Sequence, residues 1–188
     1  IVLAAGEPDF DTPDNIKNAA YEAIKKGFTK YVPGKGTPDL QAAIIKKFKE
    51  DNNLEYTNEN ITVGCGGKHI IYNAFSATLN KGDEVLIPAP YWVSYPDMVI
   101  LNDGKPITIS CNEDTGFKLT PEDLEKKITL QTKWLMLNSP SNPTGSMYSK
   151  NELIELGKVL KKHEHVYILS DDIYEKIVYE GNEFSTIA

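Results

Sequence analysis

Residues 64–68 combine Gly64, Gly66 and Gly67 with Lys68, directly before a stretch with the apolar spacing of a helix. Glycines let the backbone approach a ligand closely, and the N-terminus of a helix presents free N–H groups and a positive dipole. A phosphate or a carboxylate is the ligand that such a segment suits. A tight turn between a strand and a helix, with a solvated lysine, is the alternative that these residues leave open.

Three further segments carry polar or aromatic residues directly after apolar runs. Trp92 could lie flat on a planar ring or pack in the core. Residues 138–145 contain two X-Pro bonds, which restrict the backbone, and their asparagines can bind a ligand oxygen or build an ordinary turn. Asp171, at the end of a run, needs a positive partner such as a protonated pyridine nitrogen, or else it caps the next turn. We expect its neighbour Asp172 at the surface.

The elements that must position these segments are predicted to alternate between helix and strand, which indicates an α/β fold. Helical patterns follow Thr-Pro pairs that begin at Thr12, Thr37 and Thr120. In each pair the threonine is the expected N-cap, and the proline is expected at the first helical position. Ser149 and Glu152 have the spacing of a capping box ahead of another helix.

Between the helices lie short apolar runs that we expect to be strands. The last two runs are almost continuously apolar, which is typical of parallel strands covered on both faces. Ligands of open α/β sheets bind beyond the carboxyl ends of the strands, where the segments above are found. The expected strands are residues 61–63, 84–87, 106–110, 133–137 and 166–170.

The composition excludes several other classes of protein. The chain has 188 residues, 40% of them hydrophobic, and a formal net charge of −7. These values are those of a globular chain, and an acidic chain without a lysine-rich block is a poor partner for nucleic acid or an anionic membrane. No apolar run reaches the roughly 18 residues of a membrane span. Cys65 and Cys111 have neither the spacing of a disulfide framework nor that of a zinc site, so we expect a cytoplasmic protein without a metal.

Taken together, these segments resemble the class I aminotransferases, which are pyridoxal-phosphate enzymes, and most closely the bacterial aspartate/prephenate aminotransferase branch. This resemblance implies a fold type I large domain, incomplete here, with a mixed, mostly parallel sheet sandwiched by helices. Residues 1–36 would lead into that domain and residues 37–188 would form part of it. The motifs that carry the resemblance are Gly6-Glu7-Pro8-Asp9-Phe10, Tyr31 with Pro33 and Gly36, Gly66-Gly67-Lys68, residues 90–96, residues 138–145 and residues 170–174.

The resemblance implies pyridoxal 5′-phosphate as the cofactor and assigns residues to its binding. Asp171 would pair with the pyridine nitrogen and keep it protonated. Asn142 and Tyr174 would hydrogen-bond the phenolic oxygen of the ring, and Trp92 would stack on its face. The phosphate would be surrounded by Gly66, Gly67 and Lys68.

The resemblance also implies a substrate site and a partner. Gly6 would lie against the α-carboxylate of the substrate, which Trp92 and Asn142 would also contact. Lys68 would bind the distal carboxylate of acidic substrates as well as the phosphate. Tyr31 would reach the phosphate of a neighbouring subunit, which implies a homodimer with shared sites.

The implied reaction is a ping-pong transfer of an amino group from L-aspartate or glutamate to a 2-oxo acid such as 2-oxoglutarate, with prephenate as a further acceptor. In the family, the lysine that forms the Schiff base follows the Asp-x-x-Tyr segment, and here it would lie beyond Ala188. The chain contains no arginine, so the arginines that bind carboxylate and phosphate in the family would also have to come from elsewhere. We therefore expect a part of a longer enzyme, without the small domain and inactive alone.

Two kinds of alternative remain at this point, and a third lacks its sequence motif. An aromatic aminotransferase or a carbon–sulfur lyase of the same fold would use the same residues. An aminotransferase-like domain that senses the cofactor in a transcription regulator is an alternative of another class. A Rossmann-type nucleotide-binding domain would require a GxGxxG motif after its first strand, and the sequence has no such set.

Overall fold

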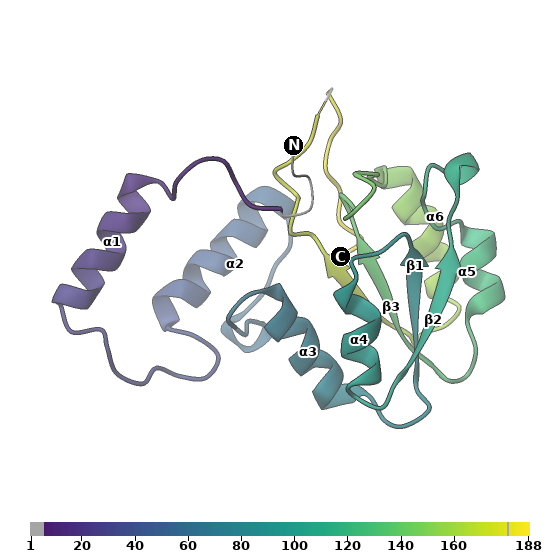
Figure 1. Ribbon diagram of the computed structural model, residues 1–188, viewed down its shortest axis with the longest axis horizontal. Helices are drawn as coiled ribbons and strands as arrows, with labels where there is room; N and C mark the ends of the chain where they lie inside the picture. The colour runs from purple at the N-terminus through teal and green to yellow at the C-terminus, as the bar shows by residue number, and fades with distance from the viewer. Residues whose placement is uncertain (1–5, 180) are drawn as a thin grey trace.

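Figure 1 shows the computed structural model, which describes residues 6–179 and 181–188. Six α-helices and two single-turn 3-10 helices surround a four-stranded sheet in this part of the chain. The strands are β1 (Glu84–Ala89), β2 (Lys105–Ser110), β3 (Thr132–Asn138) and β4 (Tyr167–Asp171). The helices are α1 (Asp14–Lys25), α2 (Pro38–Asn52), η1 (Asn58–Asn60), α3 (Gly67–Thr78), α4 (Ser94–Ile100), η2 (Glu113–Thr115), α5 (Pro121–Lys127) and α6 (Lys150–Leu160).

The described strands are parallel and lie in the order β2-β1-β3-β4. The chain enters the sheet at β1, moves outward through α4 to β2, returns through α5 to β3 and continues through α6 to β4. The direction of strand addition therefore reverses between β1 and β3. Ligands of parallel α/β sheets bind at the carboxyl ends of the strands beside such a reversal. The predicted α/β class, with a mostly parallel sheet, is confirmed.

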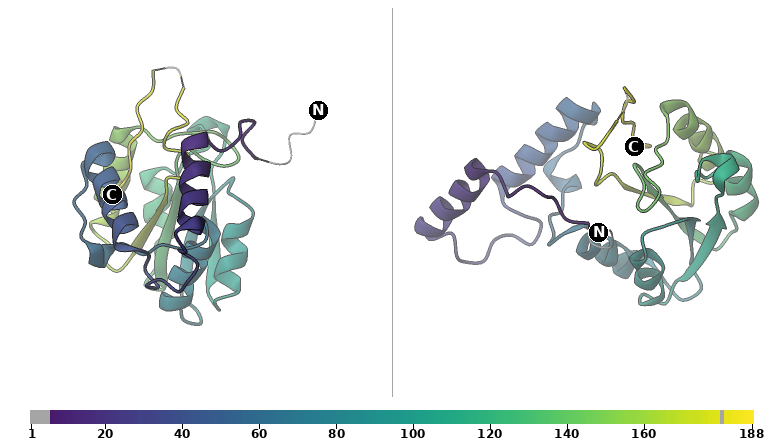
Figure 2. Two further views of the ribbon diagram at one scale, coloured as in Figure 1. Left: turned by 90° about the vertical axis from the view of Figure 1, so that its left-hand side faces the viewer. Right: turned by 45° about the horizontal axis from the view of Figure 1, so that its top comes forward.

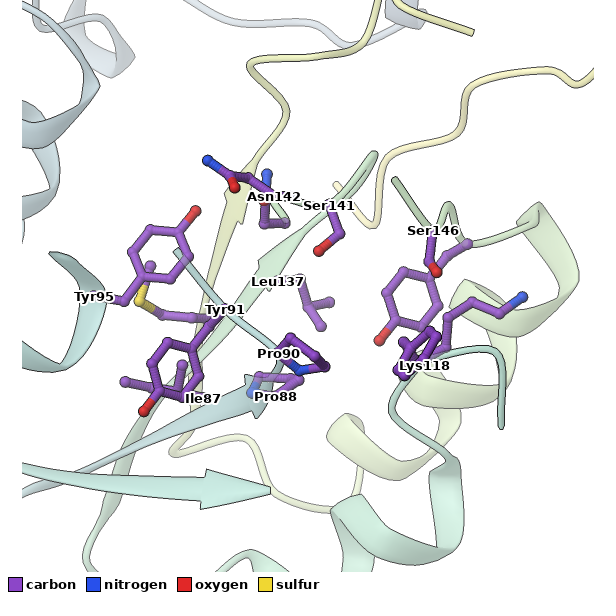
Figure 3. Close-up of a pocket in the computed structure, with 14 residues that line it drawn as sticks. Ile87, Pro88, Pro90, Tyr91, Tyr95, Lys118, Leu137, Ser141, Asn142 and Ser146 are labelled. Atoms are coloured by element: carbon purple, nitrogen blue, oxygen red, sulfur yellow. Dashed lines mark hydrogen bonds between the residues drawn. The ribbon is translucent and has the colours of Figure 1, made fainter. Parts of the chain in front are cut away.

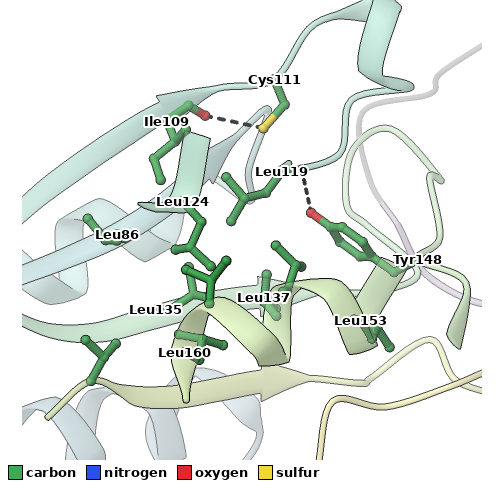
Figure 4. Close-up of a cluster of buried hydrophobic side chains, with 13 residues drawn as sticks. Leu86, Ile109, Cys111, Leu119, Leu124, Leu135, Leu137, Tyr148, Leu153 and Leu160 are labelled. Carbon is green, nitrogen blue, oxygen red and sulfur yellow. Dashed lines mark hydrogen bonds between the residues drawn. The ribbon is translucent and has the colours of Figure 1, made fainter. Parts of the chain in front are cut away.

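The central strands are covered on both faces. Successive side chains of a strand point to opposite faces, so Val85 and Ile87 of β1 pack with Phe75 of α3 and with α4. Leu86, between them, points the other way and packs with Leu124 of α5 and with α6. Figure 4 shows the side chains of this second cluster. Burying such a side chain contributes roughly 1.5–3 kcal/mol, and the two clusters together hold the strand ends rigidly in place.

Three of the four predicted helix starts are confirmed. The side chains of Thr37, Thr120 and Ser149 each accept a hydrogen bond from a backbone N–H in the first turn of α2, α5 and α6. The prediction for α1 is wrong by one residue, because Pro13 is the N-cap there and Thr12 lies outside the helix. Pro13 has a ψ of 142°, which is an extended conformation, so the helix cannot include it.

Two strand predictions are also corrected. Residues 61–63 form no strand within the described residues, because the Val63 N–H bonds to the Lys35 carbonyl at 3.3 Å without a continuing ladder. β4 lies at the edge of the described sheet, where Tyr167 is 54% exposed and Ile168 is 39% exposed. The prediction of a strand covered on both faces therefore holds for β3 and is wrong for β4.

α1 and α2 lie beside the sheet rather than in either helical layer (Figures 1 and 2). α1, which is described in full, has no buried residue and exposes Ile16, Tyr21 and Ile24. In the described part of the chain, no helix combines the length and the apolar character needed to cross a membrane.

Candidate functional site

The carboxyl ends of β3 and β4, the segment after β1 and the N-terminus of α3 meet at one pocket. Its volume is about 540 Å³, which is typical of a small-molecule site. The pocket contains every residue predicted for the site except Gly66 and Tyr31. Its lining consists of Gly6, Gly67, Lys68, Trp92, Val93, Tyr95, Asn138, Asn142, Asp171, Ile173 and Tyr174.

Asp171 is the last residue of β4, and its half-buried carboxylate lines the pocket. Its Oδ2 accepts a hydrogen bond from the Tyr95 hydroxyl at 2.7 Å, and its Oδ1 accepts one from the Ile173 backbone N–H at 3.3 Å. Both donors are neutral, so they leave the negative charge uncompensated. A half-buried carboxylate with neutral partners suits a positively charged ligand atom.

Tyr95 is a site residue to which the sequence analysis assigned no role. It is only 3% exposed, and its ring meets the Trp92 ring edge to face, with the centroids 5.4 Å apart. Burial and the hydrogen bond to Asp171 raise the pKa of the Tyr95 hydroxyl far above its usual range. The hydroxyl therefore stays protonated and acts only as a donor to the carboxylate. The sequence feature that could have predicted Tyr95 as a site residue is its spacing from Trp92. Residues three apart at a helix start lie on one side of the turn.

The N-terminus of α3 forms the anionic-ligand end of the pocket. Gly66 is the N-cap with a φ of +86°, a conformation that glycine adopts readily. A Cβ at Gly66 or Gly67 would meet no atom within 4 Å, so the backbone there faces open space. Lys68 Nζ lies 4.9 Å from the Trp92 ring centroid, within the range of a cation–π contact. The free N–H groups of the first turn and the lysine together favour an anion.

Asn138 connects the ends of β3 and β4. Its side-chain amide donates to the Asp171 carbonyl at 2.8 Å, and its side-chain oxygen accepts from the Asn142 N–H at 2.7 Å. Tyr95, Asn138 and Asn142 also line a second cavity of about 30 Å³, which is shown in Figure 3. These contacts hold the asparagine-rich segment against the pocket with the Asn142 side chain in its lining.

Two predicted residues lie outside the lining, and one neighbour differs from expectation. Gly66 directly precedes the lining residue Gly67, whereas the Tyr31 side chain is fully exposed between α1 and α2, away from the pocket. The prediction of Asp172 at the surface is wrong, because its side chain is half-buried and accepts a hydrogen bond from Ser170 at 2.6 Å. Burial raises the pKa of the Asp172 carboxyl.

The pocket offers three different binding functions within one space. The start of α3 suits an anion, Trp92 suits a planar ring, and Asp171 suits a cationic nitrogen. Across the described ranges, no cluster of three or more His, Cys, Asp or Glu residues is placed to hold a metal ion. Cys65 and Cys111 are both free thiols.

The sequence matches the family described as aminotransferase class I and II over residues 1–188. The probable aspartate/prephenate aminotransferase of Rickettsia bellii is 59% identical over 188 residues, and the aspartate/prephenate aminotransferase of Cereibacter sphaeroides is 58% identical. Each alignment includes 100% of this chain and 47% of the relative. The chain therefore spans about half the length of the curated relatives that it matches.

Solved structures agree with the sequence comparison. The aspartate aminotransferase from Rhizobium meliloti matches with a TM-score of 0.98 and 52% identity, over 100% of this chain and 47% of that one. The aromatic aminotransferase from Pyrococcus horikoshii matches with a TM-score of 0.94 and 40% identity, over 98% of this chain and 50% of that one. The resemblance drawn from the motifs is thus confirmed, and the chain belongs to the aminotransferase class I and II family.

Proposed function

We propose that the full-length protein is a pyridoxal-phosphate-dependent aminotransferase. It transfers the amino group of L-aspartate or glutamate to a 2-oxo acid such as 2-oxoglutarate, and prephenate is a further acceptor. The observation that carries this proposal is the Asp171 carboxylate, whose hydrogen-bond donors among the described residues are neutral, in the same pocket as Trp92 and the start of α3. The names of the most similar relatives, which act on aspartate and prephenate, support the choice of substrates.

Pyridoxal 5′-phosphate fits the lining residues group by group. The backbone N–H groups at Gly67 and Lys68 would hold the phosphate, and the Trp92 indole would cover the ring. Asp171 would face the ring nitrogen, and the side chains of Asn142 and Tyr174 can both donate to the phenolic oxygen. When bound, the cofactor supplies a ring that withdraws electrons from the substrate Cα.

The residues of this chain would control where protons and charges lie. Asp171 would hold a proton at the ring nitrogen, because a carboxylate stabilises a neighbouring cation. Tyr95 would keep that carboxylate in place through its hydrogen bond of 2.7 Å. Lys68, which already lies over Trp92, would orient the distal carboxylate of an acidic substrate beside the phosphate, and Gly6 would leave room for the α-carboxylate.

We also propose a cytoplasmic homodimer in which Tyr31 reaches the phosphate site of the partner subunit. The full exposure of Tyr31 and the position of its segment beside the sheet support this arrangement (Figure 2). In this proposal residues 1–36 lead into the cofactor domain, and residues 37–188 form part of it. Residues 1–5 of the leading segment lie outside the described residues.

The proposal is tested by comparing two adjacent carboxylates in the full-length protein. Asp171→Ala should weaken pyridoxal phosphate binding by about 10- to 100-fold, the value of a hydrogen bond to a charged group, and should abolish transamination of aspartate with 2-oxoglutarate. Asp172→Asn removes the next carboxylate, which is not part of the lining of this pocket, and should leave both properties close to wild type. Wild-type affinity in the Asp171→Ala variant would refute the proposal.

The structural similarity to an aromatic aminotransferase supports a second substrate class. Steady-state kinetics of the full-length protein with aspartate and with phenylalanine as amino donors separates the two. We expect a higher kcat/KM for aspartate. A clear preference for phenylalanine would replace aspartate as the donor and retain the cofactor assignment.

A further inference from the structure

The side chain of His69 folds back onto the loop that precedes α3. His69 is the third residue of this helix, and its Nδ1 accepts a hydrogen bond from the Cys65 backbone N–H at 3.1 Å. In a capping box, the side chain of the third helical residue accepts from the N–H of the N-cap. Here the N-cap is Gly66, so the imidazole reaches one residue further back along the chain.

Asn73 orients the imidazole from the opposite side. An accepting Nδ1 carries no proton, so the neutral ring of His69 has its proton on Nε2. The atom of Asn73 nearest to that nitrogen is Nδ2, at 3.0 Å, and a half-turn of the amide puts Oδ1 there to accept the proton. Residues four apart are neighbours on a helix surface, so one ring nitrogen contacts the loop and the other contacts the helix.

The loop packs directly against this ring. A Cβ at Gly64 would lie 2.9 Å from His69 Nδ1 and 2.5 Å from Ile70 Cδ1, so any side chain at this position would push one of these two side chains away. Gly66 and Gly67, in contrast, face open space. The loop therefore has one side fixed by His69 and Ile70, and another side open in front of the helix.

We propose that His69 is a positioning residue for the phosphate end of the pocket. This inference rests on the proposed function, because it concerns the anion that the start of α3 would hold. His69 does not touch that anion. It holds Cys65, and through the backbone it holds the N–H groups of Gly67 and Lys68, in one orientation before the ligand arrives. Donors that are already ordered bind more tightly, since less conformational entropy is lost on binding.

Two substitutions separate this role from a merely structural one. Asparagine at position 69 has its amide at the distance of Nδ1 and can still accept from the Cys65 N–H. Leucine has nearly the same shape as asparagine but has no acceptor, so it cannot bond to the Cys65 N–H. His69 is exposed, so both variants should fold.

Binding is measured on the cofactor-free, full-length protein with pyridoxal phosphate, inorganic phosphate and pyridoxal. His69→Leu should weaken the binding of both phosphate compounds by about three- to tenfold, the effect of one hydrogen bond. His69→Asn should remain within about twofold of wild type, and pyridoxal, which has no phosphate, should bind equally to all three proteins. Wild-type phosphate affinity in His69→Leu, or an equal loss for pyridoxal, would overturn the inference.

Amide hydrogen exchange of residues 65–68 gives a second readout that needs no ligand. We expect faster exchange at Cys65 in His69→Leu and wild-type exchange in His69→Asn. Equal exchange in all three proteins would overturn the inference. If the wild-type protein binds no pyridoxal phosphate, the proposed function fails, whereas the exchange rates still test the contact between His69 and Cys65.

Discussion

The Tyr95 hydroxyl donates to Oδ2 of Asp171 at 2.7 Å across a separation of 76 residues. The contact joins the first turn of α4 to the last residue of β4, and these two elements lie on different parts of the sheet. Because Tyr95 is buried and keeps its proton, the bond has a fixed direction. The carboxylate is therefore oriented by the protein itself, before any ligand contributes.

A double-mutant cycle measures this contact. Tyr95→Phe, Asp171→Asn and the double variant should give a coupling of about 1.5–3 kcal/mol in the free energy of unfolding, since one partner is charged. Urea unfolding of the full-length protein supplies the values. Tyr91→Phe is the matched control, because Tyr91 lines the neighbouring small cavity and is not in the lining of the pocket that contains Asp171; its coupling with Asp171→Asn should be close to zero. A Tyr95 coupling no larger than that of Tyr91 would contradict the finding.

Replacing Lys68 tests how acidic substrates are recognised. Lys68→Met should raise the KM for aspartate by about 10- to 100-fold, because a charged hydrogen-bond donor to the distal carboxylate is lost. The KM for phenylalanine should change much less when pyridoxal phosphate is saturating. Lys81→Met, in an exposed turn, is the control for the loss of one positive charge. Equal increases in the KM for both substrates would show that Lys68 does not bind the distal carboxylate.

Asp172 should make stability depend on pH in a direction unusual for a carboxylate. Burial raises its pKa in the folded protein, so the folded state holds the proton more tightly than the unfolded state. The associated stability is present at low pH and is lost as the pH rises through the folded pKa. The free energy of unfolding of wild type minus that of Asp172→Asn should therefore fall from about pH 4 upward. A difference that rises with pH would contradict this assignment.

Glu152 should show the opposite pH dependence. Burial raises the pKa of its carboxyl, but hydrogen bonds from Lys118 and Ser149 outweigh that effect and hold the pKa below its usual range. The stabilisation is therefore present at neutral pH and is lost as the pH falls through the folded pKa. Glu152→Gln should destabilise the protein at pH 7 and have less effect near pH 3 in thermal unfolding. Glu155→Gln, on the same helix but outside the capping box, should destabilise the protein less at pH 7.

Local chemistry made part of this structure predictable from the sequence. The caps at Thr37, Thr120 and Ser149 each depend on a hydrogen bond within three residues, so neighbouring residue types are sufficient. The start of α1 was misplaced at Thr12 because the same Thr-Pro pair can hold proline either inside or outside a helix. Pro13 is compatible with a position inside the helix and with a position before it, and its ψ angle decides which of the two it adopts.

The sequence alone determined which segments follow the strands and which chemical groups they carry, because helix signals and apolar runs are local patterns. Only the tertiary structure decided that β4 is an edge strand, that Tyr95 binds Asp171 and that Asp172 is half-buried. Each of these depends on contacts between residues far apart in the chain. The sequence of an apolar run does not reveal whether the strand lies at the centre or at the edge of a sheet. Its burial is decided only when the other elements pack against it.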